Sequence, residues 1–247
     1  MKLPLPLQID NANQPESSVK YFWYWRGEDR FPPPAVIRPE EFDGGDRLAV
    51  ACTQTNLPAR QQRALVEEWC ELLPRFNGVR FLWFSSRVSQ ELFDSACRVS
   101  GLEGLYIKWS GITDLSIVEH SLALRYFHLG QSSRVESIEP LARCLKLRWL
   151  GLELLSRIRD LEPLGRLQDL EGLSLEGSMG TTWRVKSLAP VGLLTNLRYL
   201  SIANVRADDR SLAGLQSLTK LITFHHAKWW DTAELNEIKR RNPELAS

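Results

Sequence analysis

The stretch LEPLGRLQDLEGLSL, residues 161–175, decides the fold. Its leucines recur at every third position and then two apart: Leu161, Leu164, Leu167, Leu170, Leu173 and Leu175. A period of three suits short 3₁₀-like or extended turns, whereas alternation of apolar residues is typical of a β-strand. The stretch therefore predicts a tight outer turn that leads into a short buried strand.

The same strand pattern occurs seven times along the chain, at a spacing of 22 to 27 residues. The second apolar position of the seven copies reads Leu82, Leu105, Phe127, Leu150, Leu173, Leu200 and Phe224. Two positions later the chain is again apolar in every copy except the last, where His226 stands. A fixed period of this size is the signature of a leucine-rich repeat solenoid, in which each repeat buries its apolar face against its neighbours.

Three of the repeats also carry a proline in the outer turn, at Pro140, Pro163 and Pro190. Over about residues 79–228, the chain resembles the short SDS22-like or internalin-like class of bacterial leucine-rich repeat proteins. The resemblance implies a right-handed α/β solenoid with a parallel sheet on its concave side. The position that commonly carries asparagine departs from the class and reads Arg87, Ser110, Ser132, Leu155, Ser178, Val205 and Trp229. We expect the three serines to take over part of the hydrogen bonding of the turns.

Both ends of the solenoid need caps that cover the terminal apolar faces. We divide the chain into an N-terminal extension at 1–46, an N-terminal cap at 47–78, the repeats at 79–228 and a C-terminal cap helix at 229–247. The extension includes the aromatic run Tyr21 to Trp25, which predicts a strand, and the cap that follows predicts a strand at 48–52 and a helix at 56–73. The C-terminal helix is expected to open with a capping box of Asp231 and Glu234.

Composition and charge limit the classes of function. The chain has 247 residues and a net charge of +1, which gives no reason to expect nucleic acid or a membrane as a partner. Neither a leader peptide nor a membrane-spanning run is recognisable in it. Its four cysteines form no CxxC pair and are expected to be buried free thiols, with Cys70 and Cys144 on core columns. These observations favour a cytoplasmic protein.

In the strand pattern, the residues between the apolar columns are expected to emerge together on the concave side. Many of them are aromatic, and we predict a partner-binding face made of Phe81, Trp83, Tyr106, Tyr126, His128, Trp149 and Tyr199, with Trp109 nearby. Trp183 lies in the longest repeat and is predicted to be an exposed loop residue that also grips a partner. The alternative is that the rings pack on one another, or beneath a folded-back N-terminal segment, and meet no partner.

Enzyme motifs are not found. The sequence has no phosphate-binding glycine loop, no HExxH and no GxSxG, and the pair His225 and His226 lacks further ligands at metal spacing. We therefore expect neither a catalytic site nor a metal or other cofactor.

The hypothesis that follows is a cytoplasmic, non-catalytic protein-binding scaffold. The resemblance to small bacterial repeat proteins further suggests an immunity protein that masks a cognate toxin or effector. Two alternatives stay open: a glycan or small-ligand binder that uses the rings as stacking platforms, and self-association through the same patch. A homo-oligomer is thus an alternative and not the prediction.

Overall fold

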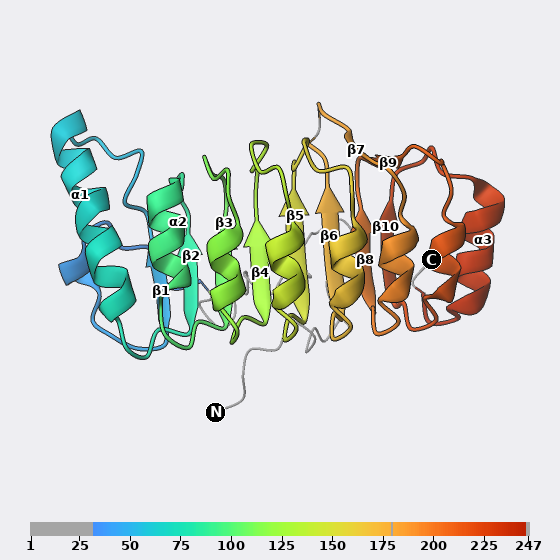
Figure 1. Ribbon diagram of the computed structural model, residues 1–247, viewed down its shortest axis with the longest axis horizontal. Coiled ribbons are helices and arrows are strands. Elements are labelled where there is room, and N and C mark those ends of the chain that lie inside the picture. Colours follow the sequence, from blue (N-terminus) through green and yellow to red (C-terminus); the bar gives the residue numbers. More distant parts are fainter. Residues whose placement is uncertain (1–31, 179, 246–247) are drawn as a thin grey trace.

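The computed structural model describes residues 32–178 and 180–245, and within them eight parallel strands form one sheet (Figure 1). The strands follow the order of the chain, except that the strand pair β7 and β9 lies outside the sheet. The sheet strands are β1 (Arg47–Val50), β2 (Phe81–Phe84), β3 (Gly104–Ile107), β4 (Tyr126–Leu129), β5 (Trp149–Glu153), β6 (Gly172–Glu176), β8 (Tyr199–Ile202) and β10 (Thr223–His226). The right-handed leucine-rich repeat solenoid predicted from the repeat is therefore the observed fold class.

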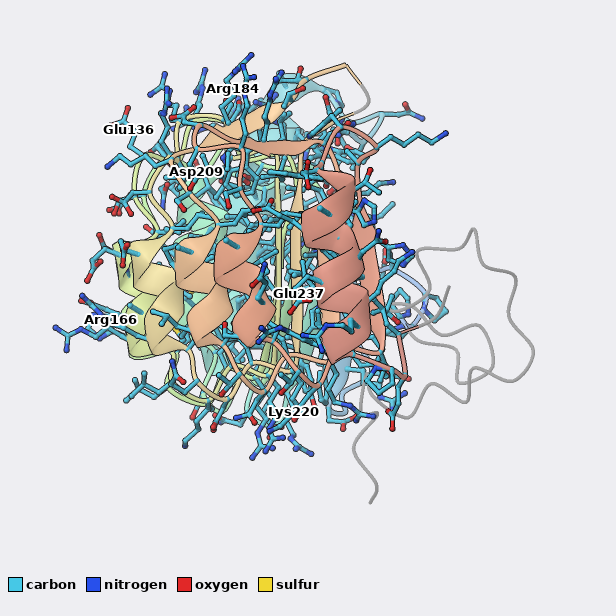
Figure 2. The ribbon with its side chains drawn as sticks, turned by 90° about the vertical axis from the view of Figure 1, so that its right-hand side faces the viewer. Glu136, Arg166, Arg184, Asp209, Lys220 and Glu237 are labelled. Carbon is cyan, nitrogen blue, oxygen red and sulfur yellow. The ribbon has the colours of Figure 1, made fainter. Side chains whose placement is uncertain are left out.

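Helices stack in a row on one side of the sheet (Figures 1 and 2). The first coils carry the α-helices α1 (Ala59–Leu72) and α2 (Gln90–Cys97), and the chain closes with α3 (Thr232–Arg241). Between them lie the 3₁₀ turns η4 (Ser116–His120), η5 (Glu139–Arg143), η6 (Glu162–Arg166), η7 (Ala189–Leu193) and η8 (Ala213–Ser217). Two short 3₁₀ turns lie near the start of the described chain: η2 (Pro39–Glu41) precedes β1, and η3 (Leu73–Arg75) follows α1. The period of three thus correctly predicted 3₁₀ turns, and the prolines sit in their first turn, where a missing N–H costs nothing.

The register of the sheet confirms the predicted columns. Leu82 pairs with Leu105, and the same row continues through Phe127, Leu150, Leu173, Leu200 and Phe224. The side chains of this row belong to the same core cluster as the leucines of the 3₁₀ turns, such as Leu141 and Leu164. The hydrophobic core therefore lies between the sheet and the row of helices, and each buried leucine contributes about 1.5–3 kcal/mol to folding.

The longest repeat does not form an open loop. Its extra residues lead into β7 (Trp183–Val185), which pairs in parallel with β9 (Val205–Ala207) of the next repeat. The indole N–H of Trp183 donates a 2.6 Å hydrogen bond to the carbonyl of Ile158, and the side chain is fully buried in the core. The prediction of an exposed, gripping Trp183 is therefore wrong, because strand pairing with β9 turns the ring inward.

Serines take part in the turns as predicted. The Ser132 hydroxyl donates to the carbonyl of Gly130 at 3.0 Å and lies 2.6 Å from the hydroxyl of Ser110. Ser110 in turn accepts the backbone N–H of Ile112 at 3.2 Å. Two consecutive repeats are therefore linked by serine side chains at the position where the class commonly has asparagine.

The C-terminal cap closes the last coil through side-chain hydrogen bonds. Asp231 accepts the N–H groups of Ala233 and Glu234, as an N-cap residue should. Glu234 does not complete the predicted capping box but reaches across to accept the N–H of Leu212 at 2.7 Å. Asn242 is buried, and its side-chain oxygen accepts the N–H of Leu221 at 2.7 Å. This hydrogen bond pairs a backbone donor at the end of the last repeat.

At the other end, the described chain begins beside the first strand. Val36 forms a parallel bridge with Val50 of β1, so the chain enters the solenoid at the outer edge of the sheet. The predicted strand at Tyr21 to Trp25 lies outside the described residues. Among the residues described, no helix combines the length and the apolar character that crossing a membrane requires.

Candidate functional site

The sheet face that the helices do not cover carries a second apolar cluster, separate from the core. We call it the ring face and define it by the side chains of Phe81, Trp83, Tyr106, Tyr126, His128, Trp149 and Tyr199. Successive residues of a strand point to opposite sides of a sheet, so these side chains emerge opposite the leucine columns. The sheet register aligns them in two rows, as the sequence predicted.

In the first row, glycines separate the rings. Phe81 and Tyr126 stand on strands either side of Gly104, and their ring centroids are 6.2 Å apart. Trp149 and Tyr199 stand on either side of Gly172 in the same way, at 5.6 Å.

The glycine is needed at 172 for steric reasons. A Cβ atom there would lie 2.2 Å from Cε3 of Trp149, closer than any side chain tolerates. The order ring, glycine, ring was already present in the sequence columns. Only the structure shows that the glycines, which have no side chain, leave room for the large rings on either side to approach each other.

In the second row, Tyr106 and His128 stack with their centroids 4.8 Å apart. The imidazole of His128 leans over Gly151, where a Cβ would lie 2.4 Å from Nδ1. Burial lowers the pKa of His128 to about 3, so the imidazole is neutral at physiological pH. Burial, and then the charge of Glu153, raises the pKa of Tyr106 to about 12. These two side chains therefore act as uncharged rings within the face.

The rings are deeply buried. Trp83 and Tyr126 are each 1% exposed, Trp149 is 2% exposed and Tyr199 is 4% exposed. The predicted partner-binding face was expected to leave its rings open to solvent, and their burial shows that this expectation is wrong. The assignment of these residues to a protein partner stays a prediction.

Trp109 lies outside the two rows, beyond the end of β3. Its indole N–H donates to the side-chain oxygen of Gln54 at 2.9 Å, and the ammonium of Lys108 lies 4.4 Å from the ring centroid. Together with Ile37 and Leu57 it lines a groove of about 750 Å³ at the first coil. Trp109 is therefore a neighbour of the ring face rather than a member of it.

Two rims of opposite character border the ring face. At the start of the strands, arginines and glutamates pair across neighbouring strands, with Arg80 donating to Glu103 at 2.8 Å and Arg148 paired with Glu171. At the end of the strands, Glu153 and Glu176 lie side by side on β5 and β6. The first rim holds four arginines and two glutamates and so keeps an excess of positive charge, whereas Glu153 and Glu176 make the second rim locally acidic.

Within the described residues, serine hydroxyls donate hydrogen bonds to one of the two glutamates of the acidic rim. Glu176 accepts hydrogen bonds from Ser174 at 2.6 Å and from Ser201 at 3.2 Å. Burial raises the pKa of Glu153, and the neighbouring charge of Glu176 raises it further. The side-by-side placement of the two glutamates follows from the strand register, which pairs Glu153 with Glu176.

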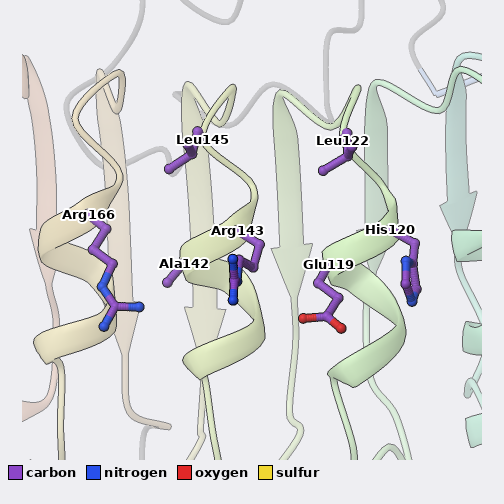
Figure 3. Close-up of a pocket in the computed structure, with 7 residues that line it drawn as sticks. All are labelled: Glu119, His120, Leu122, Ala142, Arg143, Leu145 and Arg166. Atoms are coloured by element: carbon purple, nitrogen blue, oxygen red, sulfur yellow. The ribbon is translucent and has the colours of Figure 1, made fainter.

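A separate groove lies on the helix side of the solenoid (Figure 3). It has a volume of about 720 Å³ and runs between the 3₁₀ turns η4, η5 and η6. Leu122 and Leu145 occupy equivalent places on successive coils and are 61% and 60% exposed. Arg166 on its margin is paired with Glu139 on the preceding coil. Large apolar side chains are fewer in this helix-side groove than in the ring face. Its two leucines are exposed surface residues.

The described residues hold no group of three or more histidine, cysteine or acidic side chains placed to bind a metal ion. His226, which interrupts the apolar column, contacts the carbonyl of Ala227 through Nδ1 at 3.1 Å. All four cysteines are free thiols; Cys70 is half-buried and the other three are buried. Burial raises the pKa of Cys52 and of Cys144 to about 12, so neither is a ready nucleophile.

Comparison with known proteins supports the fold. No protein-family model matches the chain, and no curated protein matches it in sequence. Among solved structures, it resembles internalin InlF of Listeria monocytogenes, with a TM-score of 0.59 and 20% identity over 70% of this chain and 48% of that one. It also resembles internalin C2 of the same organism, with a TM-score of 0.56 and 24% identity over 74% of this chain and 80% of that one.

A third similar structure is the plant peptide hormone receptor RGFR1 in complex with RGF2. The TM-score is 0.52 at 16% identity, over 73% of this chain and 29% of that chain. This chain thus spans about half the length of InlF and less than a third of the plant receptor. Similarity at this level of identity establishes the leucine-rich repeat fold.

Proposed function

We propose that the protein is a non-catalytic protein-binding scaffold whose ring face packs against a polypeptide partner. The observation that carries the proposal is the second apolar cluster, on the side of the sheet opposite the core. The fold needs only the leucine columns to bury its repeats, so the rings have no part in closing the solenoid. Tryptophan and tyrosine are also the residues most enriched among binding hot spots.

The size of the ring face suits a polypeptide. A covered aromatic side chain buries on the order of 150–250 Å². Because the five rings of the cluster are only 1–4% exposed, the proposal requires that partner binding uncovers them, and they can then supply much of the roughly 800 Å² that each partner contributes to a specific complex. The resemblance to a receptor solved with a peptide hormone agrees with such a use of this fold.

The rims suggest the charge of the partner. Glu153 and Glu176 stand together at one border of the rings, and the raised pKa of Glu153 reflects burial and the like charge beside it. A lysine or arginine of the partner placed there would relieve this repulsion. We therefore propose a partner segment that combines apolar side chains with at least one basic residue.

The test is capture followed by reconstitution. Tagged wild-type protein and the double variant Trp83→Ala/Trp149→Ala are used as baits, and each captured protein is then purified and rebound. We expect a partner that rebinds to wild type but not to the double variant, with circular dichroism at the assay temperature showing that the double variant is folded. The matched control is Leu122→Ser/Leu145→Ser on the helix side, which should bind as wild type does. A partner that binds both ring variants normally would overturn the proposal.

The immunity hypothesis specifies the partner further, as a toxin whose active surface the ring face would cover. It predicts that co-expression with a toxin gene adjacent to the gene for this protein protects bacterial cells, and that Trp83→Ala/Trp149→Ala removes the protection. Toxicity unchanged by the wild-type protein would leave the scaffold proposal standing and reject the immunity role.

We further propose that the protein works in a reducing compartment such as the cytoplasm. The four free thiols support this, because a chain that matured under oxidising conditions would expose Cys70 to disulfide exchange.

Two other outcomes of the binding experiment would change the functional class. Glycan-dependent thermal stabilisation without a captured protein would favour a glycan binder, and a concentration-dependent dimer in size-exclusion chromatography would favour self-association.

A further inference from the structure

We propose that the last strand of the sheet, β10, pairs with an extended segment of a protein partner that is apolar at its centre and acidic at its ends. The segment would add a strand to the sheet, a recognition mode in which main-chain hydrogen bonds supply affinity and alternate side chains supply specificity. This surface is separate from the ring face, and the inference goes beyond the proposed function because it needs none of the ring-face residues.

The first step is the position of β10 in the sheet. Among the residues that the structure describes, β10 has a neighbouring strand on one side alone, which is β8 (Figure 1). The closing helix α3 packs mainly on the 3₁₀ turn η8 and supplies no further strand. An edge strand of this kind offers a row of unpaired main-chain groups to a chain that can adopt an extended conformation.

The second step is the direction of these main-chain groups. The N–H of Thr223 donates to the carbonyl of Arg198, at 3.1 Å, and so points toward β8. Successive residues of a strand in a parallel sheet direct their main-chain groups to alternate sides, so the N–H groups of Phe224 and His226 point away from β8. The carbonyl of Ile222, which is in register with Arg198, and that of Phe224 point the same way. Within the described part of the chain, these outward groups have no hydrogen-bond partner.

The side chains at this edge favour an apolar centre for the added segment. Phe224 and His226 lie on the core side of β10, and their ring centroids are 5.0 Å apart. Both are half-buried, whereas Leu200 and Ile202, at the same positions one strand further in, are buried. An added strand would cover the two rings with its own apolar side chains. Trp229, which follows β10 and is 47% exposed, offers it a further apolar contact.

The charges around the edge favour acidic ends for the segment. Lys220 precedes β10 and Lys228 follows it, and both side chains are exposed. Arg198 and Lys220 line a hollow of about 310 Å³ at the start of the strand, together with Glu244. Within the described residues, none of the three basic side chains forms an ion pair with a carboxylate. Carboxylates near the two ends of the partner segment would therefore complement the lysines.

The same lysines disfavour a second copy of this chain as the occupant. A two-fold axis at Phe224 would pair the β10 edges of two copies as antiparallel strands. Lys228 of one copy would then lie opposite Lys220 of the other, and like charges directly opposite each other destabilise a sheet. A partner segment with carboxylates at these places avoids this repulsion.

The experiment follows the isotope-labelled full chain by NMR, with a synthetic heptapeptide as the probe. The peptide alternates valine and threonine and carries aspartate at both ends. In the free protein, the N–H groups of Phe224 and His226 should exchange with solvent at least about tenfold faster than those of Leu200 and Ile202. Added peptide should slow the exchange of Phe224 and His226 and shift their signals.

Two matched controls test the mode of binding. N-methylation of either the valines or the threonines removes alternate N–H donors of the peptide, so one methylated form should bind as the parent does and the other should not. Lys220→Glu should weaken binding at least about threefold, because it replaces attraction by repulsion at one end of the segment. Lys146→Glu changes the same repeat position ahead of β5 and should bind within about twofold of wild type.

The inference is overturned if Phe224 and His226 exchange as slowly as Leu200 and Ile202 at every protein concentration, because the edge is then covered within the chain. Slow exchange that appears only at high protein concentration would identify a second copy as the occupant. No response to the peptide at millimolar concentration, or equal binding of both methylated forms, would show that the edge does not accept a strand. None of these results involves the ring face, so they are distinguishable from a failure of the proposed function.

Discussion

The two faces of the same sheet are both apolar and both buried, but they are built in different ways. On the helix side, leucines repeat with the period of the solenoid, and each coil covers the next. On the other side, the residues differ from strand to strand, and rings alternate with glycine, serine and histidine. The regular face is what the fold requires, whereas the irregular face is free to be shaped by a binding partner. Substitutions on the two faces are therefore expected to differ in their effects on stability and binding.

The largest expected effects come from two neighbouring residues of β5 that point to opposite faces. Leu150→Ala should lower the free energy of unfolding by about 2–5 kcal/mol, because it opens a cavity in the leucine core. Trp149→Ala should cost about 3–5 kcal/mol in the full chain, because the ring is almost completely covered. Urea unfolding followed by circular dichroism measures both. A cost below about 1 kcal/mol for Trp149→Ala would show that its ring faces water.

The second prediction concerns pH and the neutral imidazole of the ring face. The folded pKa of His128 is about 3, below the ordinary value of 6.5, so only the unfolded chain gains this proton as the pH falls through that window. Stability should be retained above about pH 6.5 and lost below it, by up to about 1.4 kcal/mol per pH unit. Urea titrations at several pH values should give a flatter dependence for His128→Phe than for wild type. Identical slopes would contradict the burial of a neutral His128.

The third prediction tests the glycines that separate the rings. Gly172→Ala places a methyl group against Trp149 and should destabilise the protein by about 1–3 kcal/mol. Gly180→Ala is the matched control, because its added methyl would meet nothing within 4 Å, and it should change stability by less than about 0.5 kcal/mol. Equal midpoints of thermal unfolding for the two variants would mean that Trp149 does not pack over Gly172.

The smallest effect is expected on the helix side. Leu122→Ser/Leu145→Ser removes two exposed leucines and should change the free energy of unfolding by about 0.5 kcal/mol or less for each residue. Loss of several kcal/mol would show that the helix-side groove is covered in solution, and would make it a rival to the ring face.

Most of the fold could be predicted from sequence because solenoid coils contact only their neighbours. The columns that begin at Leu82 and end at Phe224 fixed the strand register, and the period of three around Leu164 and Leu167 predicted the 3₁₀ turns. These are local patterns, repeated often enough to be unambiguous. The rows of rings followed from the same alternation along each strand.

The predictions that failed all concerned which other parts of the folded protein a side chain contacts. The strand pattern placed Trp83 and Tyr126 on the concave side of the sheet, but it did not show that each side chain is only 1% exposed. Trp183 was mistaken for a loop residue because glycines precede it, although its alternation with the buried Val185 was a strand signal. Glu234 satisfied the capping-box spacing but bonds to Leu212, a contact across the fold that spacing cannot show.

The central claim is that the leucine face folds the protein and the ring face binds its partner. Isothermal titration of the reconstituted partner against matched variants on the two sides tests it most directly. Under conditions where circular dichroism shows that the variant is folded, the account predicts that Trp83→Ala/Trp149→Ala weakens binding at least about 30-fold, as expected when hot-spot residues worth about 2 kcal/mol are lost. It also predicts that Leu122→Ser/Leu145→Ser changes binding less than about twofold. Normal binding by the ring variant, with binding lost in the helix-side variant, would contradict it.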